Sequence, residues 1–325
     1  MRIFELENGK GMRARVSTYG ATLLSLHAPD RDGRPGPVVL GFEDPARYLG
    51  PHPHLGATVG RYANRIAGGR FDLDWRNVRL TRNEGRHHLH GGDTGFGRVE
   101  WVGHAEPAGV RLEYASADDE EGYPGSVDVE VTYRLNEANE LRIDWRAHSS
   151  RSTVINLTHH SYFNLRDGGA SPVLDHELQV NADAFTPIDA EGIPTGELDP
   201  VEGTALDFCE PRRLGERIQA LVSERGGYDH NFALHSGGGL TWAARLRDPA
   251  SGRALEVRTT QPGLQLYTGN FLDGRPWPRW HGVCLETQHF PDSPNRLHFP
   301  STRLEPGEEY AETVVYAFSV DAADA

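Results

Sequence analysis

Alternating apolar and polar positions recur along the chain and predict β-strands. Apolar side chains occupy every second position over residues 127–135 and again over residues 141–147, on either side of a turn at residues 136–140. Because successive side chains of a strand point to opposite faces, this pattern indicates a hairpin with one buried face. A second hairpin is predicted around the turn at residues 248–252, and residues 310–320 form a further strand rich in β-branched and aromatic residues.

Helical periodicity is scarce. The best candidate covers residues 211–224, where a proline stands at the first position and leucine and isoleucine follow at helical spacing. Residues 44–48 predict a shorter helical turn. Many strands with few helices imply an all-β fold, a large antiparallel β-sandwich. Since no repeat, low-complexity tract or long linker divides the chain, we expect one domain over residues 1–325.

Residues 156–165, Asn-Leu-Thr-His-His-Ser-Tyr-Phe-Asn-Leu, are the central polar run of the chain. As a strand, this run presents one mainly apolar face, on which His159 points among Leu157 and Phe163. The opposite face carries only hydrogen-bonding side chains: Asn156, Thr158, His160, Tyr162 and Asn164. Such a row is a poor core but a suitable lining for a cleft that binds a ligand covered in hydroxyl groups.

Composition and charge exclude several classes of function. The net charge is −14, whereas a nucleic-acid partner needs a basic surface that displaces counterions from phosphates. Two cysteines make neither a disulfide framework nor a thiolate zinc site, and they favour a reducing compartment. The N-terminus lacks the apolar segment of a secretion signal, and no apolar run is long enough to span a membrane. We therefore expect a cytoplasmic protein with no nucleic-acid or membrane partner.

Five further stretches place polar groups where a strand pattern favours carbon. A carboxylate such as Glu286, near the end of an apolar strand, is costly to bury without a partner, so a role in a site is favoured. The polar residues of these stretches are Asn64 and Arg65, His88 and His90 before Gly91-Gly92, Asp229 after Gly226-Gly227, Gln265 and Tyr267 on the strand face opposite Leu264 and Leu266, and Glu286.

A metal site is one alternative for the histidines. His88 and His90 share a strand face if the strand is regular, and His52, His54 and His160 supply further ligands. The helical His-Glu-x-x-His pattern of zinc proteases is missing. We therefore favour histidines that face a sugar, and predict no metal.

Two hydrolytic alternatives also arise from these residues. A serine hydrolase can be assembled from Ser161, His160 and Asp229, but the chain has no Gly-x-Ser-x-Gly elbow. A retaining glycosidase needs two carboxylates that flank one bond, and Asp229 with Glu286 leaves that alternative open.

Six blocks of sequence, in this order, resemble the aldose 1-epimerase (galactose mutarotase) family. They are Gly60-Arg-Tyr-Ala-Asn-Arg-Ile66, Leu89-His-Gly-Gly92, residues 156–165, Tyr228-Asp-His-Asn-Phe232, Gln261-Pro-Gly-Leu-Gln-Leu-Tyr-Thr-Gly-Asn-Phe271 and Leu285-Glu-Thr-Gln-His-Phe-Pro-Asp292. The resemblance implies a large antiparallel β-sandwich that interconverts the α and β anomers of free hexoses without a cofactor. One departure is His159, which stands where the family frequently has asparagine.

The resemblance also implies roles for individual residues. Glu286 corresponds to the family's catalytic base, His160 to its acid, and His90 to an assisting histidine. Substrate-binding positions follow from the same blocks and from the polar face of the central run: Asn64, Arg65, His90, His160, Tyr162, Asp229, Gln265 and Glu286.

The remaining expectations concern charge, partners and alternatives. Because a nearby carboxylate favours a charged imidazole, we expect Glu286 or Asp229 to hold His160 protonated. The expected partner is a small aldose sugar, and the expected state is a monomer or weak homodimer. A non-catalytic sugar-binding domain and an epimerase acting on hexose 6-phosphates are the alternative functions.

Overall fold

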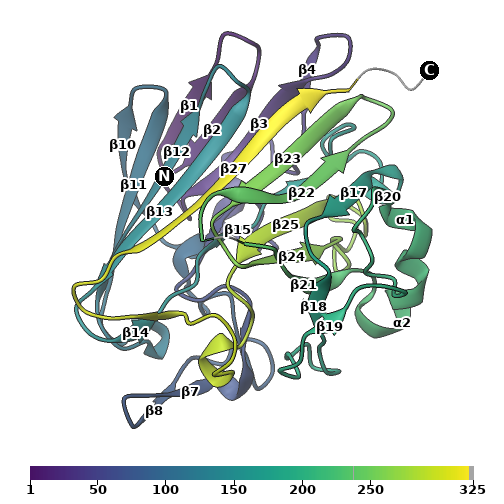
Figure 1. The fold of residues 1–325 in the computed structure, drawn as a ribbon. Helices are drawn as coiled ribbons and strands as arrows, with labels where there is room; N and C mark the ends of the chain where they lie inside the picture. The colour runs from purple at the N-terminus through teal and green to yellow at the C-terminus, as the bar shows by residue number, and fades with distance from the viewer. Residues whose placement is uncertain (237, 322–325) are drawn as a thin grey trace.

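The computed structural model describes residues 1–236 and 238–321, and most of its elements are antiparallel strands (Figure 1). The largest sheet has nine strands in the order β10-β11-β12-β13-β27-β23-β22-β17-β20. Their bounds are β10 (Val102–Glu106), β11 (Gly109–Ser116), β12 (Val127–Leu135), β13 (Glu140–Ser149), β27 (Tyr310–Val320), β23 (Arg253–Thr259), β22 (Thr241–Arg247), β17 (Glu177–Val180) and β20 (Arg212–Arg213).

Two smaller sheets complete the sandwich. A six-stranded sheet contains β16 (Tyr162–Phe163), β25 (Val283–Gln288), β24 (Gly263–Tyr267), β21 (Asp229–Ala233), β18 (Ala184–Thr186) and β19 (Asp199–Pro200), in that order. A four-stranded sheet contains β1 (Ile3–Glu7), β2 (Arg13–Ser17), β3 (Thr22–Pro29) and β4 (Pro35–Pro37).

Short strand pairs and helical turns connect these sheets. The pairs are β14 (Thr153–Val154) with β26 (Arg303–Leu304), β15 (Thr158–His159) with β5 (Thr58–Val59), β6 (Arg65–Ile66) with β9 (His88–Leu89), and β7 (Arg70–Leu73) with β8 (Arg76–Arg79). The helical segments are η1 (Pro45–Leu49), η2 (Ala67–Gly69), η3 (Phe96–Arg98), η4 (Glu120–Gly122), η5 (Val173–Asp175), α1 (Leu214–Arg217), η6 (Ile218–Leu221), α2 (Val222–Arg225) and η7 (Ser293–Asn295).

The apolar faces of the three larger sheets meet in one core. Val16 on β2, Trp145 on β13 and Leu285 on β25 belong to the same buried cluster. Alternation along β13 shows why, because its apolar residues are buried while Arg142 and Arg146 between them face solvent. The fold is therefore an all-β antiparallel sandwich with very little helix, which confirms the predicted fold class.

The predicted hairpins and terminal strand are confirmed. Strands β12 and β13 pair across the turn with Leu135 opposite Leu141, and β22 pairs with β23 around the second predicted turn. Strand β27 covers the predicted terminal segment and joins β13 to β23 in the sheet. The turn predicted near residue 44 is η1, where the Asp44 side chain accepts a hydrogen bond from the backbone N–H of Ala46.

The prediction of one continuous strand over residues 156–165 is wrong. Its first half contributes β15, which pairs with β5, and its second half contributes β16, which pairs with β25 in another sheet. The break lies at His160, because its backbone N–H donates to the Ala57 carbonyl and its carbonyl accepts from the Gly56 N–H. This contact diverts the chain from one sheet to the other, so the run has no single polar face.

Three of the polar side chains of this run fasten the backbone instead of lining a cleft. The Asn156 amide binds the backbone N–H and carbonyl of His289, and Thr158 Oγ1 donates to the Thr287 carbonyl. Asn164 Nδ2 donates to the carbonyls of Ser171 and His281. The predicted apolar setting of His159 is confirmed, since its ring packs against Tyr133 and Tyr316 and burial lowers its pKa to about 3.

The helix predicted over residues 211–224 begins later and is broken into α1, η6 and α2. Ile218 and Leu221, three positions apart, are both buried. A 3₁₀ turn has three residues per turn and so places both side chains on the face toward the core. The middle of the segment is therefore a 3₁₀-helix, and the segment as a whole is not a regular α-helix.

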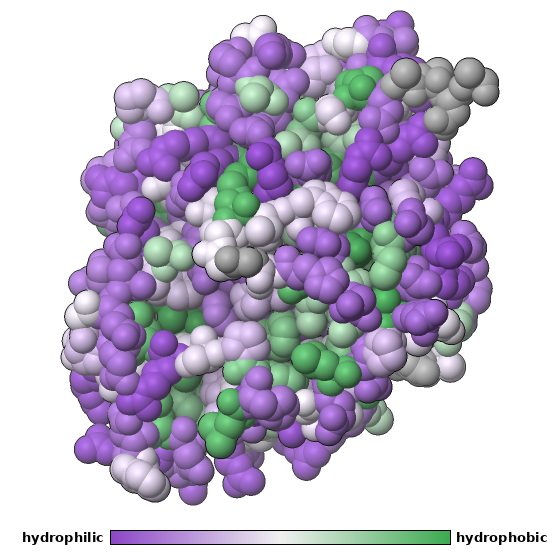
Figure 2. Space-filling model, in the orientation of Figure 1, coloured by the Kyte–Doolittle hydropathy of each residue, from purple (hydrophilic) through white to green (hydrophobic). Residues whose placement is uncertain are grey.

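The visible surface of the molecule is mainly polar (Figure 2), as expected from a chain with many charged residues. The face of the molecule seen in Figure 1 is mostly hydrophilic, with apolar residues in separate patches (Figure 2). Within residues 1–236 and 238–321, no helix combines the length and the apolar character that crossing a bilayer requires.

Trp145 provides a test of the core. Its side chain is fully buried, whereas Trp75, at the tip of the β7–β8 hairpin, is fully exposed. Trp145→Ala leaves a cavity in the sandwich and is expected to lower the free energy of unfolding by about 3–5 kcal/mol in urea titrations. Trp75→Ala is the matched control and should change it by less than about 0.5 kcal/mol. Equal effects of the two substitutions would contradict this core.

Candidate active site

The six-stranded sheet separates an apolar face from a polar face. In an antiparallel pair, residues directly opposite each other point to the same side. Glu286 lies opposite Gln265 across β25 and β24, and Asp229 lies opposite Tyr267 across β21 and β24. The alternate residues Leu264, Leu266 and Leu285 belong to the core. The predicted placement of Gln265 and Tyr267 opposite the leucines is therefore confirmed.

His160 reaches this polar face from the turn between β15 and β16. Its Nε2 atom lies 3.7 Å from Oε2 of Glu286, and both side chains are almost completely buried. The chain break at His160, which the sequence did not predict, aims the imidazole at the polar face of β25. The structure thus brings together the two residues that the resemblance names as acid and base.

His90 is held in place by Asn64. The backbone N–H of His90 donates to the backbone carbonyl of Asn64. The backbone N–H of Asn64 donates in return to the ring nitrogen Nδ1 of His90, over 3.2 Å. Because a backbone N–H is always a donor, Nδ1 must be the unprotonated nitrogen of the ring. Neutral His90 therefore carries its proton on Nε2, which makes it a hydrogen-bond donor toward the site.

The backbone conformation of Gly91 explains why a glycine follows His90. Its φ is +85°, and a Cβ at this position would overlap the carbonyl oxygen of Gly60. Only glycine permits this approach, as the paired glycines predict. The prediction that His88 and His90 share a strand face is wrong, because His90, with φ +52°, lies in a left-handed turn. His88 instead binds the Thr81 carbonyl and the Tyr123 hydroxyl, each at 2.6 Å.

A metal ion is an alternative ligand for the polar face. His90, His160 and Glu286 bring one ligand atom each within 4.8 Å of one another, which is compatible with a bound cation. A histidine ligand, however, needs a lone pair on the nitrogen that faces the metal. With Nδ1 of His90 accepting from the backbone, its other nitrogen carries the proton. The chemistry of these donors fits a hydrogen-bonded ligand better than a metal.

Two arginines near the site are paired with carboxylates. Arg65 makes a bidentate pair with Glu84 through hydrogen bonds of 2.6 and 2.7 Å. Arg225 donates to one oxygen of Asp229 at 3.0 Å, and Gln265 Nε2 donates to the other at 2.7 Å. These contacts fix the orientation of Asp229, and each carboxylate oxygen still has room to accept a further hydrogen bond.

Tyr162 lies behind His160. The two ring centroids are 5.0 Å apart, and Tyr162 is buried in a small cluster with Leu40 and Cys284. The ring therefore packs against the imidazole from the side of the core. Its predicted contact with a sugar stays a prediction.

Several buried oxygen atoms on the polar face lack a hydrogen-bond donor. They are Oε2 of Glu286, Oε1 of Gln265 and Oδ1 of Asn231, three residues that follow one another across β25, β24 and β21. Buried acceptors without donors are unfavourable, and most proteins satisfy them. A ligand that presents several O–H groups supplies the missing donors.

Burial dominates the pKa values of His160 and Glu286. It lowers the pKa of His160 to about 4, although the charge of Asp229 raises it. Burial also raises the pKa of Glu286 well above its usual range, with a further rise from Asp229 and an opposing effect of Arg65. The expectation that a carboxylate keeps His160 charged is therefore wrong for the free protein, because desolvation outweighs the attraction.

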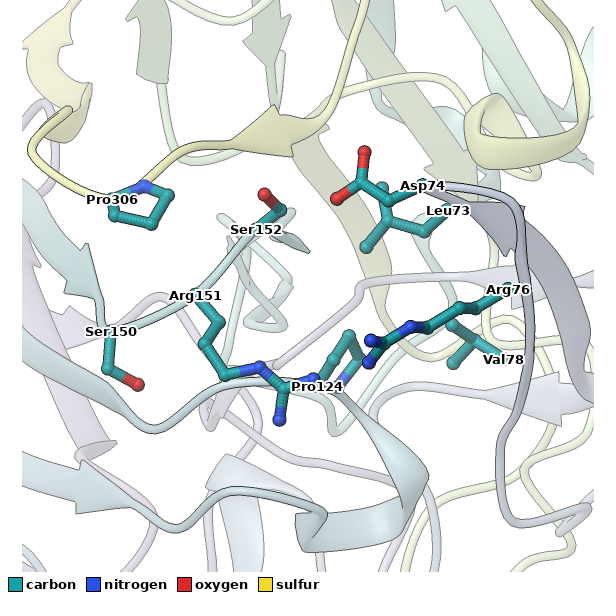
Figure 3. Close-up of a pocket in the computed structure, with 9 residues that line it drawn as sticks. All are labelled: Leu73, Asp74, Arg76, Val78, Pro124, Ser150, Arg151, Ser152 and Pro306. Atoms are coloured by element: carbon teal, nitrogen blue, oxygen red, sulfur yellow. The ribbon is translucent and has the colours of Figure 1, made fainter.

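A separate surface cavity of about 360 Å³ lies beside the β7–β8 hairpin (Figure 3). Its lining includes Arg76, Arg151 and Asp74, but no residue of the six-stranded sheet. Arg151 pairs with Asp118, and Asp74 pairs with Arg303. Two of its three charged side chains are therefore paired with residues outside the lining, and the cavity does not form a constellation suited to catalysis.

The sequence did not single out four residues that shape the site: Glu84, Arg225, Asn231 and Cys284. Two of them left a readable signal. Arg225 stands four positions before Asp229 at the end of a helical segment, and Cys284 stands two positions before Glu286 on one strand face. Glu84 gave no such signal, because its partner Arg65 is 19 positions away.

Comparisons with known proteins identify the family of this chain. The sequence profile of the aldose 1-epimerase family matches residues 2–317. The chain is 46% identical over 324 residues to galactose mutarotase from Sus scrofa, covering 98% of this chain and 94% of that protein. It is 38% identical over 329 residues to aldose 1-epimerase from Escherichia coli K12, with coverages of 98% and 95%.

A solved structure of an aldose epimerase homologue from C. elegans superimposes with a TM-score of 0.93 at 31% identity, over 99% of each chain. The profile match spans both the core strands and the residues of the candidate site. The chain belongs to the aldose 1-epimerase family.

Proposed function

We propose that Glu286 and His160 interconvert the α and β anomers of free aldose sugars by opening and reclosing the ring. The chain is an isomerase of the aldose 1-epimerase type, as its relatives indicate. The observation that carries the residue assignment is the 3.7 Å approach of His160 Nε2 to an unpartnered oxygen of Glu286 on the polar face.

The reaction consists of proton transfers around one carbon atom. Glu286 takes the proton of the C1 hydroxyl, the bond between C1 and the ring oxygen breaks, and His160 gives its proton to that oxygen. The open aldehyde turns about the bond to C2, and the reverse transfers close the ring on the other face. Atoms and charges balance without a cofactor. A positioned acid or base contributes roughly 10²- to 10⁴-fold to such a rate.

The buried setting favours the ring-opened state. The transfers start from ionised Glu286 and charged His160 and leave both groups neutral. Burial stabilises these neutral forms, as the raised pKa of Glu286 and the lowered pKa of His160 indicate. The neutral and the charged pair hold the same number of protons, so they differ only in where one proton lies. A sugar hydroxyl that donates to Glu286 stabilises its anion and so supports transfer of the proton to His160.

The other polar groups hold the sugar. Asp229 and Gln265 offer acceptor oxygens for hydroxyl groups, and Asn64 and Arg65 offer donors beside His90. His90 Nε2–H is positioned to donate to a sugar oxygen on which charge develops, because its tautomer is set by Asn64. All of these side chains come from one copy of the chain, so activity in a monomer or weak homodimer requires no residue from a partner.

Two alternatives are less well supported. A binding module has no need of a buried carboxylate with an unpartnered oxygen, since that group is costly unless it reacts or binds. A hexose 6-phosphate needs uncompensated cations around its phosphate. Arg65 and Arg225, the arginines bound into the described site, are already paired with Glu84 and Asp229. The site therefore favours uncharged sugars.

Glu286→Gln tests the proposed base. The amide keeps the shape of the side chain but cannot accept a proton, so kcat for glucose or galactose mutarotation in a polarimeter should fall roughly 10²- to 10⁴-fold. Glu256→Gln, at a partly exposed position of β23 in the other sheet, is the control and should retain the wild-type rate. A Glu286→Gln enzyme with wild-type kcat would rule out this assignment.

Asp229→Asn tests the proposed sugar contact. The substitution removes the charge that strengthens hydrogen bonds from sugar hydroxyls, so KM should rise roughly tenfold while kcat stays close to that of the wild type. Asp199→Asn, at an exposed position on strand β19 of the same sheet, should leave both parameters unchanged. The assignment fails if Asp229→Asn changes kcat alone.

A further inference from the structure

Cys284 is buried beside the proposed acid. It lies on β25 two positions before Glu286 and points to the same polar face, directly opposite Tyr162 and Tyr267 on the neighbouring strands. Its sulfur atom is 3.5 Å from Nδ1 of His160, within hydrogen-bond distance for sulfur. The side chain is fully buried.

We propose that the Cys284 sulfur accepts a hydrogen bond from Nδ1–H of His160 and thereby keeps Nε2 directed at the reacting sugar. Cys284 is then a positioning residue that acts through the imidazole. This inference rests on the proposed role of His160 as the acid.

The position of the two ring nitrogens sets the direction of the hydrogen bond. Nε2 faces Glu286 at 3.7 Å and must gain and lose the transferred proton in each turnover. Nδ1 must then keep its proton in both the charged and the neutral ring, and that N–H needs an acceptor throughout. In the described part of the chain, Cys284 is the polar side chain in contact with Nδ1.

The surroundings of the ring leave little freedom to turn. The rings of Tyr162, His90 and His54 lie 5.0, 5.3 and 5.8 Å from the imidazole, measured between centroids. These neighbours restrict the ring plane, but two orientations related by a flip of the ring remain similar in shape. The hydrogen bond to sulfur distinguishes them, because it requires Nδ1 and not a carbon atom at that position.

A thiol suits this position chemically. Burial raises the pKa of Cys284 well above its usual range, so the sulfur stays neutral. A neutral thiol is a weak acceptor. A carboxylate in its place would stabilise the charged imidazole strongly and weaken it as an acid. Sulfur orients the ring without that effect.

The test combines ¹⁵N NMR of the histidine ring with kinetics of two variants. In the wild-type protein at neutral pH, the His160 signals, assigned by their loss in His160→Gln, should show a protonated Nδ1 and an unprotonated Nε2. Cys284→Ala should shift the proton toward Nε2 and lower kcat roughly tenfold with KM near the wild-type value. Cys284→Ser restores an acceptor and should recover most of kcat. Cys209→Ala, at the exposed second cysteine, is the matched control and should change nothing.

The outcomes separate this inference from the proposed function. A wild-type ring with its proton on Nε2, or an unchanged kcat in folded Cys284→Ala, overturns the role of Cys284 even if His160→Gln is inactive. A protonated Nδ1 together with a fully active His160→Gln upholds the contact and overturns the acid assignment. If Cys284→Ala does not fold, the wild-type spectrum and Cys284→Ser decide the question.

Discussion

A buried carboxylate without a donor is the constraint on which the site depends. Glu286 is almost completely buried, and one of its oxygens has no hydrogen-bond partner. Such a group is unfavourable in a folded protein, and the cost is expressed in its strongly raised pKa. The neighbouring acceptors of Gln265 and Asn231 share this deficit. In the proposed function, a sugar, whose surface is rich in O–H donors, supplies the hydrogen bonds that the fold leaves open.

The six-stranded sheet makes this arrangement tolerable. Its other face is packed with leucines against the core of the sandwich, so the strands are held firmly while their polar face stays available. A shift of β25 by one residue would exchange the two faces and place Glu286 in the apolar core. The arginines of the region are compensated by Glu84 and Asp229, which prevents them from neutralising Glu286 directly. Glu286 is thus left without an arginine partner, as its proposed role as the base requires.

Alternation in the sequence was sufficient to predict the sandwich, the main hairpins and the two faces of β24. It could not predict the break at His160, because that break depends on hydrogen bonds to Gly56 and Ala57, about a hundred residues earlier. The direction of the pKa of His160 was predicted wrongly for a related reason. The sequence motifs indicated that carboxylates lie near His160. The extent to which His160 is buried decides the direction of its pKa shift, and that burial is visible only in the folded structure.

The central claim is that Glu286 and His160 flank the edge of one sugar ring between C1 and the ring oxygen. The most direct measurement is a crystal structure of the Glu286→Gln variant with glucose or galactose bound. The account predicts the C1 hydroxyl at the side chain of residue 286 and the ring oxygen within about 3 Å of His160 Nε2. A sugar bound with C1 turned away from both side chains, or bound elsewhere on the molecule, would contradict it.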